Sequence, residues 1–284
     1  MPGRQNRTGR AASAEERAVA QAKAAIEAGR ITEAEQLARD VLARKPAHRA
    51  AAHVLGVALL AQGKPSDAIA LLEIAIRDSA DPVIETHLAM ALRQAGRTND
   101  AMACLERAVT REPPFPPAFH ELGTLLDSLN QFERAEAVLR KGLKLSPAAA
   151  DTWCALGGVL LMRGDRDGAQ MAFARALVER RGHPGALFGQ ACVLRDNAEF
   201  ARAAEIYREV LRQDPERADA RLQLGYCLLE LDQWEEAIAS LRSAIALEPR
   251  LYEKACHILV RSARGRFWLR PSALAQVLPV GPRA

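Results

Sequence analysis

Aromatic residues are scarce in this sequence, and long apolar runs are missing. Its 284 residues include seven Phe, three Trp and three Tyr, and Gly, Arg or Gln breaks the longest apolar stretches. A transmembrane helix needs about 20 mostly apolar residues in a row, so an ordinary membrane-spanning helix is not expected. Thr and Ile are also sparse, Ala is abundant, and there are no alternating β-branched runs. This composition predicts an all-α protein with almost no sheet.

Closely spaced cysteines are missing as well. The chain has five, an odd number, and none belongs to a C-x-x-C pair: Cys104, Cys154, Cys192, Cys227 and Cys256. A disulfide framework or a zinc site would show a paired spacing, so the sequence predicts neither. We interpret the cysteines as small residues of a core or groove.

The charges are unevenly distributed along the chain. The net charge is +4, to which residues 1–14 contribute +3 and residues 250–284 contribute +6, so residues 15–249 carry −5. A solenoid that follows nucleic-acid phosphates needs a continuous basic face. Nucleic acid is therefore not expected as the primary ligand.

The N-terminus carries Arg4, Arg7 and Arg10, but no apolar stretch follows them. Secretory signals and lipoprotein leaders both need such a stretch, so neither is predicted. We expect a cytoplasmic protein.

A short break followed by an amphipathic run recurs every 33 or 34 residues, as in QGKPSDAIALL and AGRTNDAMACL. One position holds Ala in every repeat: Ala34, Ala68, Ala101, Ala135, Ala169, Ala203 and Ala237. Twelve residues before this Ala each repeat has Gly or Ala, and twelve residues after it most repeats have Pro. Repetition at this period indicates an array of helix pairs. Two antiparallel helices approach closely only where side chains are small, so we expect the Gly or Ala of the first helix to face the Ala of the second. Pro is expected to end the second helix.

This pattern resembles the tetratricopeptide repeat, whose signature runs from a large residue through Leu-Gly, an aromatic or Leu, Ala, Phe or Leu, and Ala to Pro. The fifth repeat shows it as Trp153, Leu156, Gly157, Leu160, Ala169, Phe173 and Ala176. The resemblance covers residues 15–249 and implies a right-handed superhelical solenoid of antiparallel helix pairs. It divides the chain into seven repeats: 15–48, 49–81, 82–115, 116–149, 150–183, 184–217 and 218–251.

Four segments are expected in the whole chain. A basic, flexible N-terminal arm (1–14) precedes the solenoid (15–251). A capping helix (252–264) follows, because the last repeat of an array would otherwise leave its core side in water. The C-terminal extension (265–284) contains the pair Phe267 and Trp268 and a short helix. This pair is interpreted either as part of a lid over the cap, which we favour, or as a docking peptide for an acidic partner.

The resemblance also implies a concave groove lined by the first helix of each pair. Its predicted partner-binding residues are His53, Val57, Met90, Arg93, His120, Thr124, Asp127, Phe188, Arg195 and Tyr226. This mixture of apolar and polar side chains suits an extended peptide or a helix of a partner protein.

Two groove types of related proteins do not fit the sequence. The chaperone-tail clamp needs Lys and Asn one turn apart, but the equivalent positions hold Val19 and Lys23, or His53 and Val57. The asparagine ladder of sugar-transferring relatives is also absent. Its positions read Ala20, Val54, His87, Glu121, Ala155, Gly189 and Gln223.

No motif indicates catalysis or a metal site. His53, His87 and His120 come from different predicted helices and lack carboxylates at ligand spacing, so we interpret them as polar groove or surface residues. HELGT at 120–124 lacks the second His of a zinc protease. No phosphate-binding loop or nucleophile elbow occurs, so we predict neither a cofactor nor an enzyme.

The sequence therefore predicts a non-catalytic scaffold or adaptor for a protein partner that it does not identify. One alternative is a targeting or regulatory subunit of an enzyme that modifies glycans or polypeptides, because similar arrays are often fused to such domains. Another is contact of the basic arms with nucleic acid or a membrane surface. Self-association through the terminal repeats also stays open.

Overall fold

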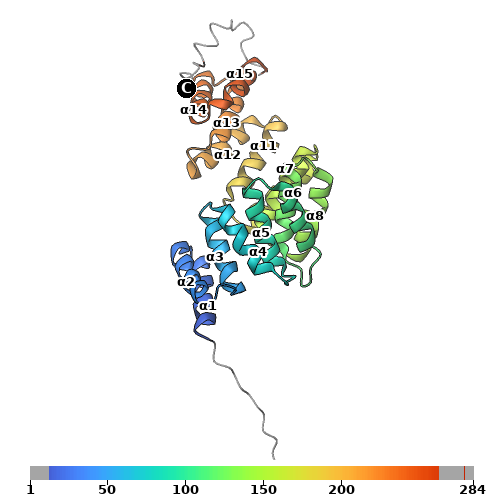
Figure 1. Cartoon of the computed structure of the whole chain (residues 1–284). Coiled ribbons are helices and arrows are strands. Elements are labelled where there is room, and N and C mark those ends of the chain that lie inside the picture. The colour runs from blue at the N-terminus through green and yellow to red at the C-terminus, as the bar shows by residue number, and fades with distance from the viewer. Residues whose placement is uncertain (1–12, 262–277, 279–284) are drawn as a thin grey trace, which may run out of the picture. The chain divides into compact units, whose positions relative to one another are not determined.

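The computed structural model describes residues 13–261 and Leu278, and within them all regular secondary structure is helical (Figure 1). The predicted all-α fold is confirmed. The predictions for Phe267 and Trp268, for the short helix near the C-terminus and for the end of the capping helix at residue 264 lie outside the described residues.

Helices follow one another in pairs along the described chain. The first helices of the pairs are α1 (Ala14–Glu27), α3 (Arg49–Ala61), α5 (Pro82–Gln94), α7 (Pro116–Ser128), α9 (Ala150–Met162), α11 (Pro184–Asp196) and α13 (Ala218–Glu230). The second helices are α2 (Ile31–Arg44), α4 (Pro65–Ile76), α6 (Thr98–Ala108), α8 (Phe132–Leu145), α10 (Arg166–Glu179), α12 (Phe200–Gln213) and α14 (Trp234–Leu247). A 3-10 turn, η1 (Pro249–Leu251), leads into α15 (Tyr252–Arg261).

The chain divides within α7 into two compact bodies, an N-terminal body of residues 1–125 and a C-terminal body of residues 126–284. In the N-terminal body each helix from α1 to α6 contacts the next, and α3 also contacts α1 and α5. In the C-terminal body each helix from α8 to α14 contacts the next, and α9, α11, α13 and α15 contact one another in series. In each body the first helices thus form a continuous layer, against which the second helices pack.

The turn inside each pair is made by one residue in the left-handed backbone conformation. These residues recur at the repeat period, with φ between +57° and +82°: Gly29, Gly63, Gly96, Asn130, Gly164, Ala198 and Asp232. Gly adopts this conformation without a steric penalty, and Asn and Asp tolerate it better than most residues. Ala198 is the exception, because at its φ of +59° the Cβ lies too close to the following carbonyl oxygen and the backbone is strained.

Four of the second helices end just before a proline, as expected. The residues that follow α2, α8, α12 and α14 are Lys45, Ser146, Asp214 and Glu248, and each leaves the helical conformation, with φ near −136°. Each also precedes a proline, whose ring disfavours helical geometry in the residue before it. Proline is sufficient but not required, since Arg180 ends α10 in the same conformation with Arg181 after it. Pro113 stands twelve residues after Ala101, where a proline was expected to end the second helix, but α6 already ends at Ala108, so the expectation is wrong in this repeat.

The small residues of the first helices contact larger side chains than the sequence led us to expect. A Cβ added to Gly56 would lie 2.8 Å from the Leu72 side chain, and one added to Gly225 would lie 2.8 Å from Leu241. The Ala that recurs in the second helices contributes its backbone instead. The carbonyl oxygen of Ala237 lies 3.2 Å from the position of a Cβ added to Gly225. Gly therefore makes room for the large residue of the second helix and not for the Ala alone.

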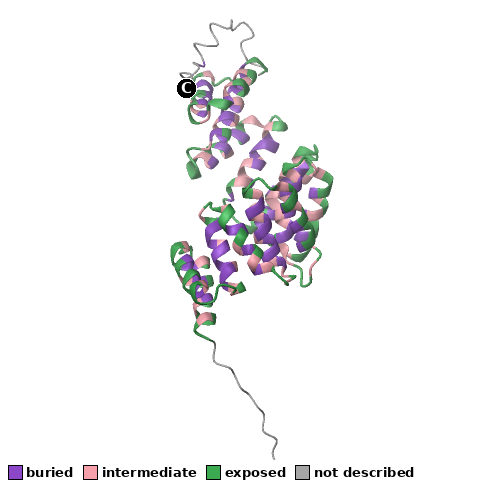
Figure 2. Ribbon diagram, in the orientation of Figure 1, coloured by how far each residue is buried: buried purple, intermediate pink, exposed green. Residues whose placement is uncertain are grey.

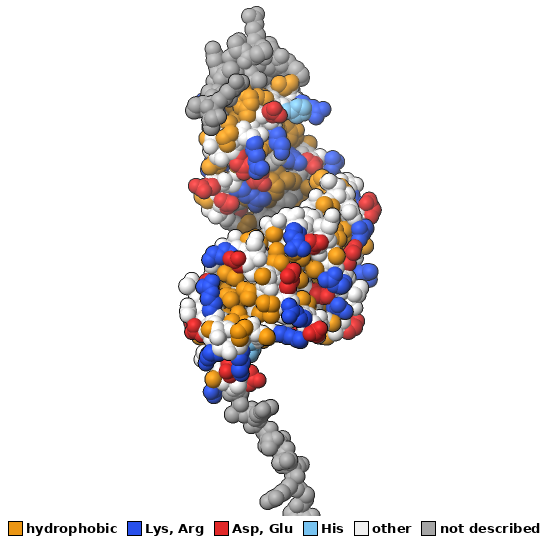
Figure 3. Space-filling view, viewed as in Figure 1, with side chains coloured by type: hydrophobic (Ala, Val, Ile, Leu, Met, Phe, Trp, Pro, Cys, Tyr) orange, Lys and Arg blue, Asp and Glu red, His pale blue; other side chains and the backbone are white. Residues whose placement is uncertain are grey.

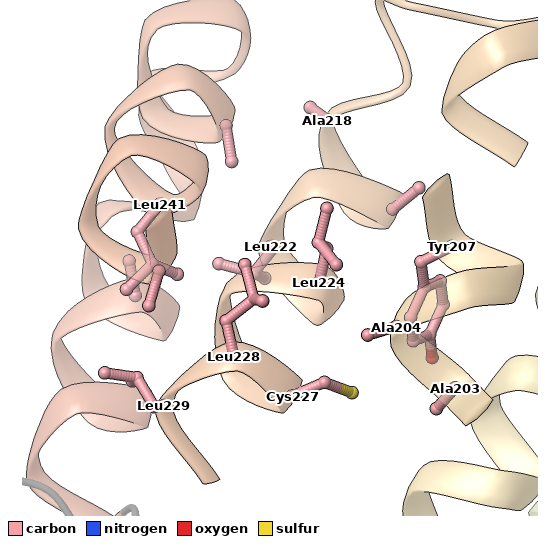
Figure 4. Close-up of a cluster of buried hydrophobic side chains, with 14 of the residues drawn as sticks. Ala203, Ala204, Tyr207, Ala218, Leu222, Leu224, Cys227, Leu228, Leu229 and Leu241 are labelled. Atoms are coloured by element: carbon pink, nitrogen blue, oxygen red, sulfur yellow. The ribbon is translucent and has the colours of Figure 1, made fainter. Parts of the chain in front are cut away.

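The core of each body lies between its two helix layers (Figure 2). In the C-terminal body α13 packs between α12 and α14, so its buried side chains face Tyr207 on one side and Leu241 on the other (Figure 4). Leu278 joins this cluster and is fully buried, together with Ala255 and Leu259 of α15. The cap helix thus contributes an apolar face to the last repeat, as a repeat array requires.

Candidate partner-binding groove

The predicted groove residues lie on the first helices, and most of them are half-buried. In the N-terminal body His53 and Val57 come from α3, Met90 and Arg93 from α5, and His120 and Thr124 from α7. In the C-terminal body Asp127 comes from α7, Phe188 and Arg195 from α11, and Tyr226 from α13. Half-burial leaves part of each of these side chains accessible from the surface.

His53 and His87 lie side by side, although the sequence predicted no contact between them. His53 Nε2 lies 2.9 Å from His87 Nδ1, and the two ring centroids are 5.0 Å apart. Burial, with His87 and Lys23 nearby, lowers the pKa of His53 to about 4. Burial also lowers the pKa of His87. Both imidazoles are therefore neutral at pH 7, and one ring donates its hydrogen to the other.

Arg93 reaches from α5 to α7. Its guanidinium lies 2.8 Å from the Glu121 carboxylate and donates a hydrogen bond of 3.3 Å to the Thr124 hydroxyl. Two predicted groove residues, Arg93 and Thr124, thus contact each other, and Arg93 is also paired with the Glu121 carboxylate.

Arg195 makes the same type of contact in the C-terminal body. It donates a hydrogen bond of 2.6 Å from α11 to the Gln223 side-chain oxygen on α13, and it also pairs with Asp196 at 2.6 Å. Arg93 and Arg195 occupy the same position in their repeats, as do Glu121 and Gln223.

His87, Glu121 and Gln223 share one repeat position. In Sequence analysis this position was considered only because the asparagine ladder of related proteins would occupy it. In the structure each of them holds a groove side chain from the preceding first helix. These polar contacts restrict the predicted groove side chains, and such restriction lowers the entropy that ordering a side chain costs. A search for polar residues at that position, of any type, would have found them.

The aromatic groove residues are held by other contacts. Phe188 lies edge-on to Tyr207, with centroids 5.6 Å apart, and the Arg217 guanidinium lies 4.2 Å from the Phe188 ring centre. Tyr226 lies edge-on to Phe200 at 5.9 Å. Arg217 was not predicted from the sequence; it precedes α13, where it can stack on an aromatic ring of α11.

A cavity of about 690 Å³ opens between α11, α13 and α15. It is lined by Arg195, Leu222, Gln223, Tyr226, Glu253, Lys254, His257, Ile258 and Arg261. The sequence predicted Arg195 and Tyr226 as groove residues, but the contribution of α15 was missed because that helix was interpreted only as a cap. Cavities of this size are typical of ligand sites.

Glu85 is a buried charge that was not predicted from the sequence. Its carboxylate lies 3.2 Å from Arg107 and 3.0 Å from Arg111, and its side chain is only 3% exposed. The equivalent position holds Phe119 and Trp153 in the next two repeats, so a lone carboxylate there was a detectable signal. Its contacts join α5 to the end of the third repeat and mark a structural rather than a groove residue.

Over residues 13–261 and Leu278, no three His, Cys, Asp or Glu side chains are grouped so that they could hold a metal ion. Within the same residues no helix is both long and apolar enough to cross a membrane.

Comparison with known proteins agrees with the helix pairs. Models of the tetratricopeptide repeat match residues 19–82, 92–151 and 188–251, which together make up more than half of the chain. The chain belongs to the tetratricopeptide repeat (TPR) family. The matches include the first repeat, where Ala22, Ala25 and Ala38 are buried.

Individual relatives are distant. The protein CTR9 homolog of Arabidopsis thaliana is 29% identical over 120 residues, which are 42% of this chain and 11% of that protein. The APC/C hetero-tetramer Cut9-Hcn1 superposes with a TM-score of 0.76 and 17% identity, covering 86% of this chain and 48% of the other. YrrB, described as a TPR protein with an unusual peptide-binding site, gives 0.51 and 22%, covering 66% of this chain and 96% of YrrB.

These structural likenesses show the same TPR fold. TPR arrays in general act as protein-interaction scaffolds, and the chain shares their helix-pair construction.

Proposed function

We propose that this TPR chain is a non-catalytic, cytoplasmic scaffold that binds a peptide or a helix of a partner protein on its first-helix layer. The observation that carries the proposal is the cavity between α11, α13 and α15, because it is formed by the helix layer on which groove residues were predicted. The peptide-binding site described for YrrB supports the same use of the fold.

The contacts between successive first helices support this proposal. The pairs His53 with His87, Arg93 with Glu121 and Arg195 with Gln223 hold groove side chains in place before any ligand arrives. Met90 and Tyr226 are half-buried, so they present apolar surface that a partner can cover. Preorganised polar groups beside apolar anchors are typical of peptide-binding surfaces.

The test is co-purification of partners from the native cell with single variants in each body. Met90→Glu places a charge in the groove of the N-terminal body, and Tyr226→Ala removes an apolar ring in the C-terminal body. Met171→Glu is the matched control, because Met171 is 67% exposed on the second helix α10. We expect a specific partner to be lost with Met90→Glu or Tyr226→Ala and retained with Met171→Glu. An unchanged partner list for both groove variants would rule out the first-helix layer as the binding surface.

A further inference from the structure

The cavity between α11, α13 and α15 has an apolar floor and a polar rim. Leu222 is 4% exposed, and Ile258 and the Tyr226 ring are half-buried beside it. The rim is formed by exposed residues of α15. An apolar floor of this kind accepts one or two apolar side chains of a ligand. The rim determines which polar or charged groups of the ligand can lie beside them.

The rim is predominantly basic. Lys254, His257 and Arg261 follow one another on a single face of α15, and all three are exposed. Glu253 is the acidic side chain that lines the cavity. In Figure 3 blue side chains and a pale blue histidine lie beside orange apolar atoms on the C-terminal body.

The remaining polar groups around the cavity are mostly hydrogen-bond donors. The Gln223 side-chain oxygen already accepts from Arg195, so its amide hydrogens remain for a ligand. The Tyr226 hydroxyl can also donate. Burial raises the pKa of Tyr226, which keeps this hydroxyl protonated. Ammonium, guanidinium, amide and hydroxyl donors together favour carboxylate ligands.

The sequence of this chain argues against its own tail as the occupant. Residues 262–284 contain four Arg and no acidic residue, so they bring no side-chain carboxylate to the basic rim. The N-terminal residues 1–14 of a second copy are likewise basic, with three Arg and no acidic residue. Neither terminal segment supplies a side-chain carboxylate, so a different, acidic polypeptide fits the rim better.

We propose that this cavity binds an acidic peptide segment of a partner protein, with one large apolar side chain on Leu222 and Ile258 and its carboxylates on Lys254 and Arg261. The inference rests on the proposed scaffold function and names the class of peptide for this part of the groove. Electrostatic attraction of this kind governs partner choice and association rate more than the total affinity.

The experiment measures fluorescence anisotropy of labelled nine-residue peptides with the full chain. The probe has Asp and Glu on both sides of a central Phe. One comparison peptide replaces the acids by Asn and Gln, and another replaces the Phe by Ala. We expect the acidic Phe peptide to bind at least about tenfold more tightly than either, a difference of about 1.4 kcal/mol.

Charge-reversal variants locate the binding. Lys254→Glu with Arg261→Glu should weaken the acidic peptide about tenfold or more. Lys141→Glu with Lys144→Glu is the matched control, because both lysines are exposed on α8 in the same body and outside the cavity. Circular dichroism of each variant verifies that the helices are retained. The control variant should bind the peptide as the unmodified chain does.

Four results would overturn the proposal. Two concern charge: equal affinity for the acidic and neutral peptides, and equal weakening by the α8 and α15 reversals. The others are peptide binding that is seen only after residues 262–284 are removed, and tighter binding of a single-stranded oligonucleotide than of the peptide. If native partners still depend on Tyr226 but not on Lys254 and Arg261, the scaffold function stands and the acidic-peptide assignment fails.

Discussion

His53 of α3 and His87 of α5 share a hydrogen bond of 2.9 Å between their ring nitrogens, and both are neutral at pH 7. The bond joins the first helices of two successive repeats. Asp81 favours the protonated form of both rings, but burial and, for His53, the nearby Lys23 outweigh it. The pair therefore tolerates little protonation while the protein is folded.

This pair predicts acid sensitivity. The pKa of His53 falls from 6.5 to about 4 on folding, so between these values the unfolded chain binds more protons and stability increases with pH. The stabilisation is complete above pH 6.5 and is lost as the pH falls toward 4. Acidification from pH 7 to pH 5 should lower the free energy of unfolding by at most about 2 kcal/mol through His53, since part of the ring is exposed.

Urea denaturation at pH 7 and pH 5 measures this effect. The double variant His53→Asn, His87→Asn should reduce the difference between the free energies of unfolding at the two pH values, because it has no imidazole at either position to take up a proton on unfolding. His257→Asn is the control, since His257 is exposed on α15 and the pair is left intact. A double variant with the full pH difference of the unmodified chain would show that other groups cause the acid sensitivity.

Phe173 predicts a packing constraint between successive repeats. Its ring lies against Gly157 of α9 and Gly189 of α11, where an added Cβ would lie 2.6 Å and 2.2 Å from ring carbons. Gly189→Ala should therefore destabilise the protein by about 1 to 3 kcal/mol. Gly158→Ala meets no atom within 4 Å and should be neutral or stabilise by up to about 1 kcal/mol, because Ala favours helix.

A second substitution distinguishes this clash from a general effect on α11. In the Gly189→Ala background, Phe173→Leu should cost less than it does alone, since the smaller side chain relieves the contact. Thermal denaturation of the four proteins gives this coupling. Strictly additive losses would mean that Phe173 and Gly189 do not constrain each other.

Ala198 predicts a stabilising substitution. It occupies the turn position that four other repeats fill with Gly, and its φ of +59° strains any Cβ. Ala198→Gly should raise the free energy of unfolding by about 0.5 to 1 kcal/mol, because relief of strain exceeds the entropy that Gly adds to the unfolded chain. Gly164→Ala at the equivalent turn should act in the opposite direction. Urea midpoints that move the same way in both variants would contradict this explanation.

Most of the fold could be predicted from the repeat period. The small, large and turn residues recur at the same positions, because every repeat packs its two helices in the same way. The sequence could not predict which groove residues contact each other. Arg93 and Glu121 lie 28 positions apart in sequence order, as do Arg195 and Gln223, and only the offset of successive first helices brings them together. The part of α15 in the cavity was missed for a related reason, since its exposed basic face has no counterpart in the repeats.

Glu85 predicts a stability difference between two substitutions at one site. Its buried carboxylate accepts hydrogen bonds from Arg107 and Arg111, whose side chains are partly exposed. Glu85→Ala removes these bonds and leaves a cavity, so it should cost about 2 kcal/mol or more, below the full loss for a wholly buried ion pair because the arginines can reach water. Glu85→Leu should cost less than Glu85→Ala, since it fills the space as the apolar residues of other repeats do at this position. Urea denaturation of the two variants decides the matter, and a Leu variant no more stable than the Ala variant would show that the ion pairs, rather than the packing, hold α5 to the end of the third repeat.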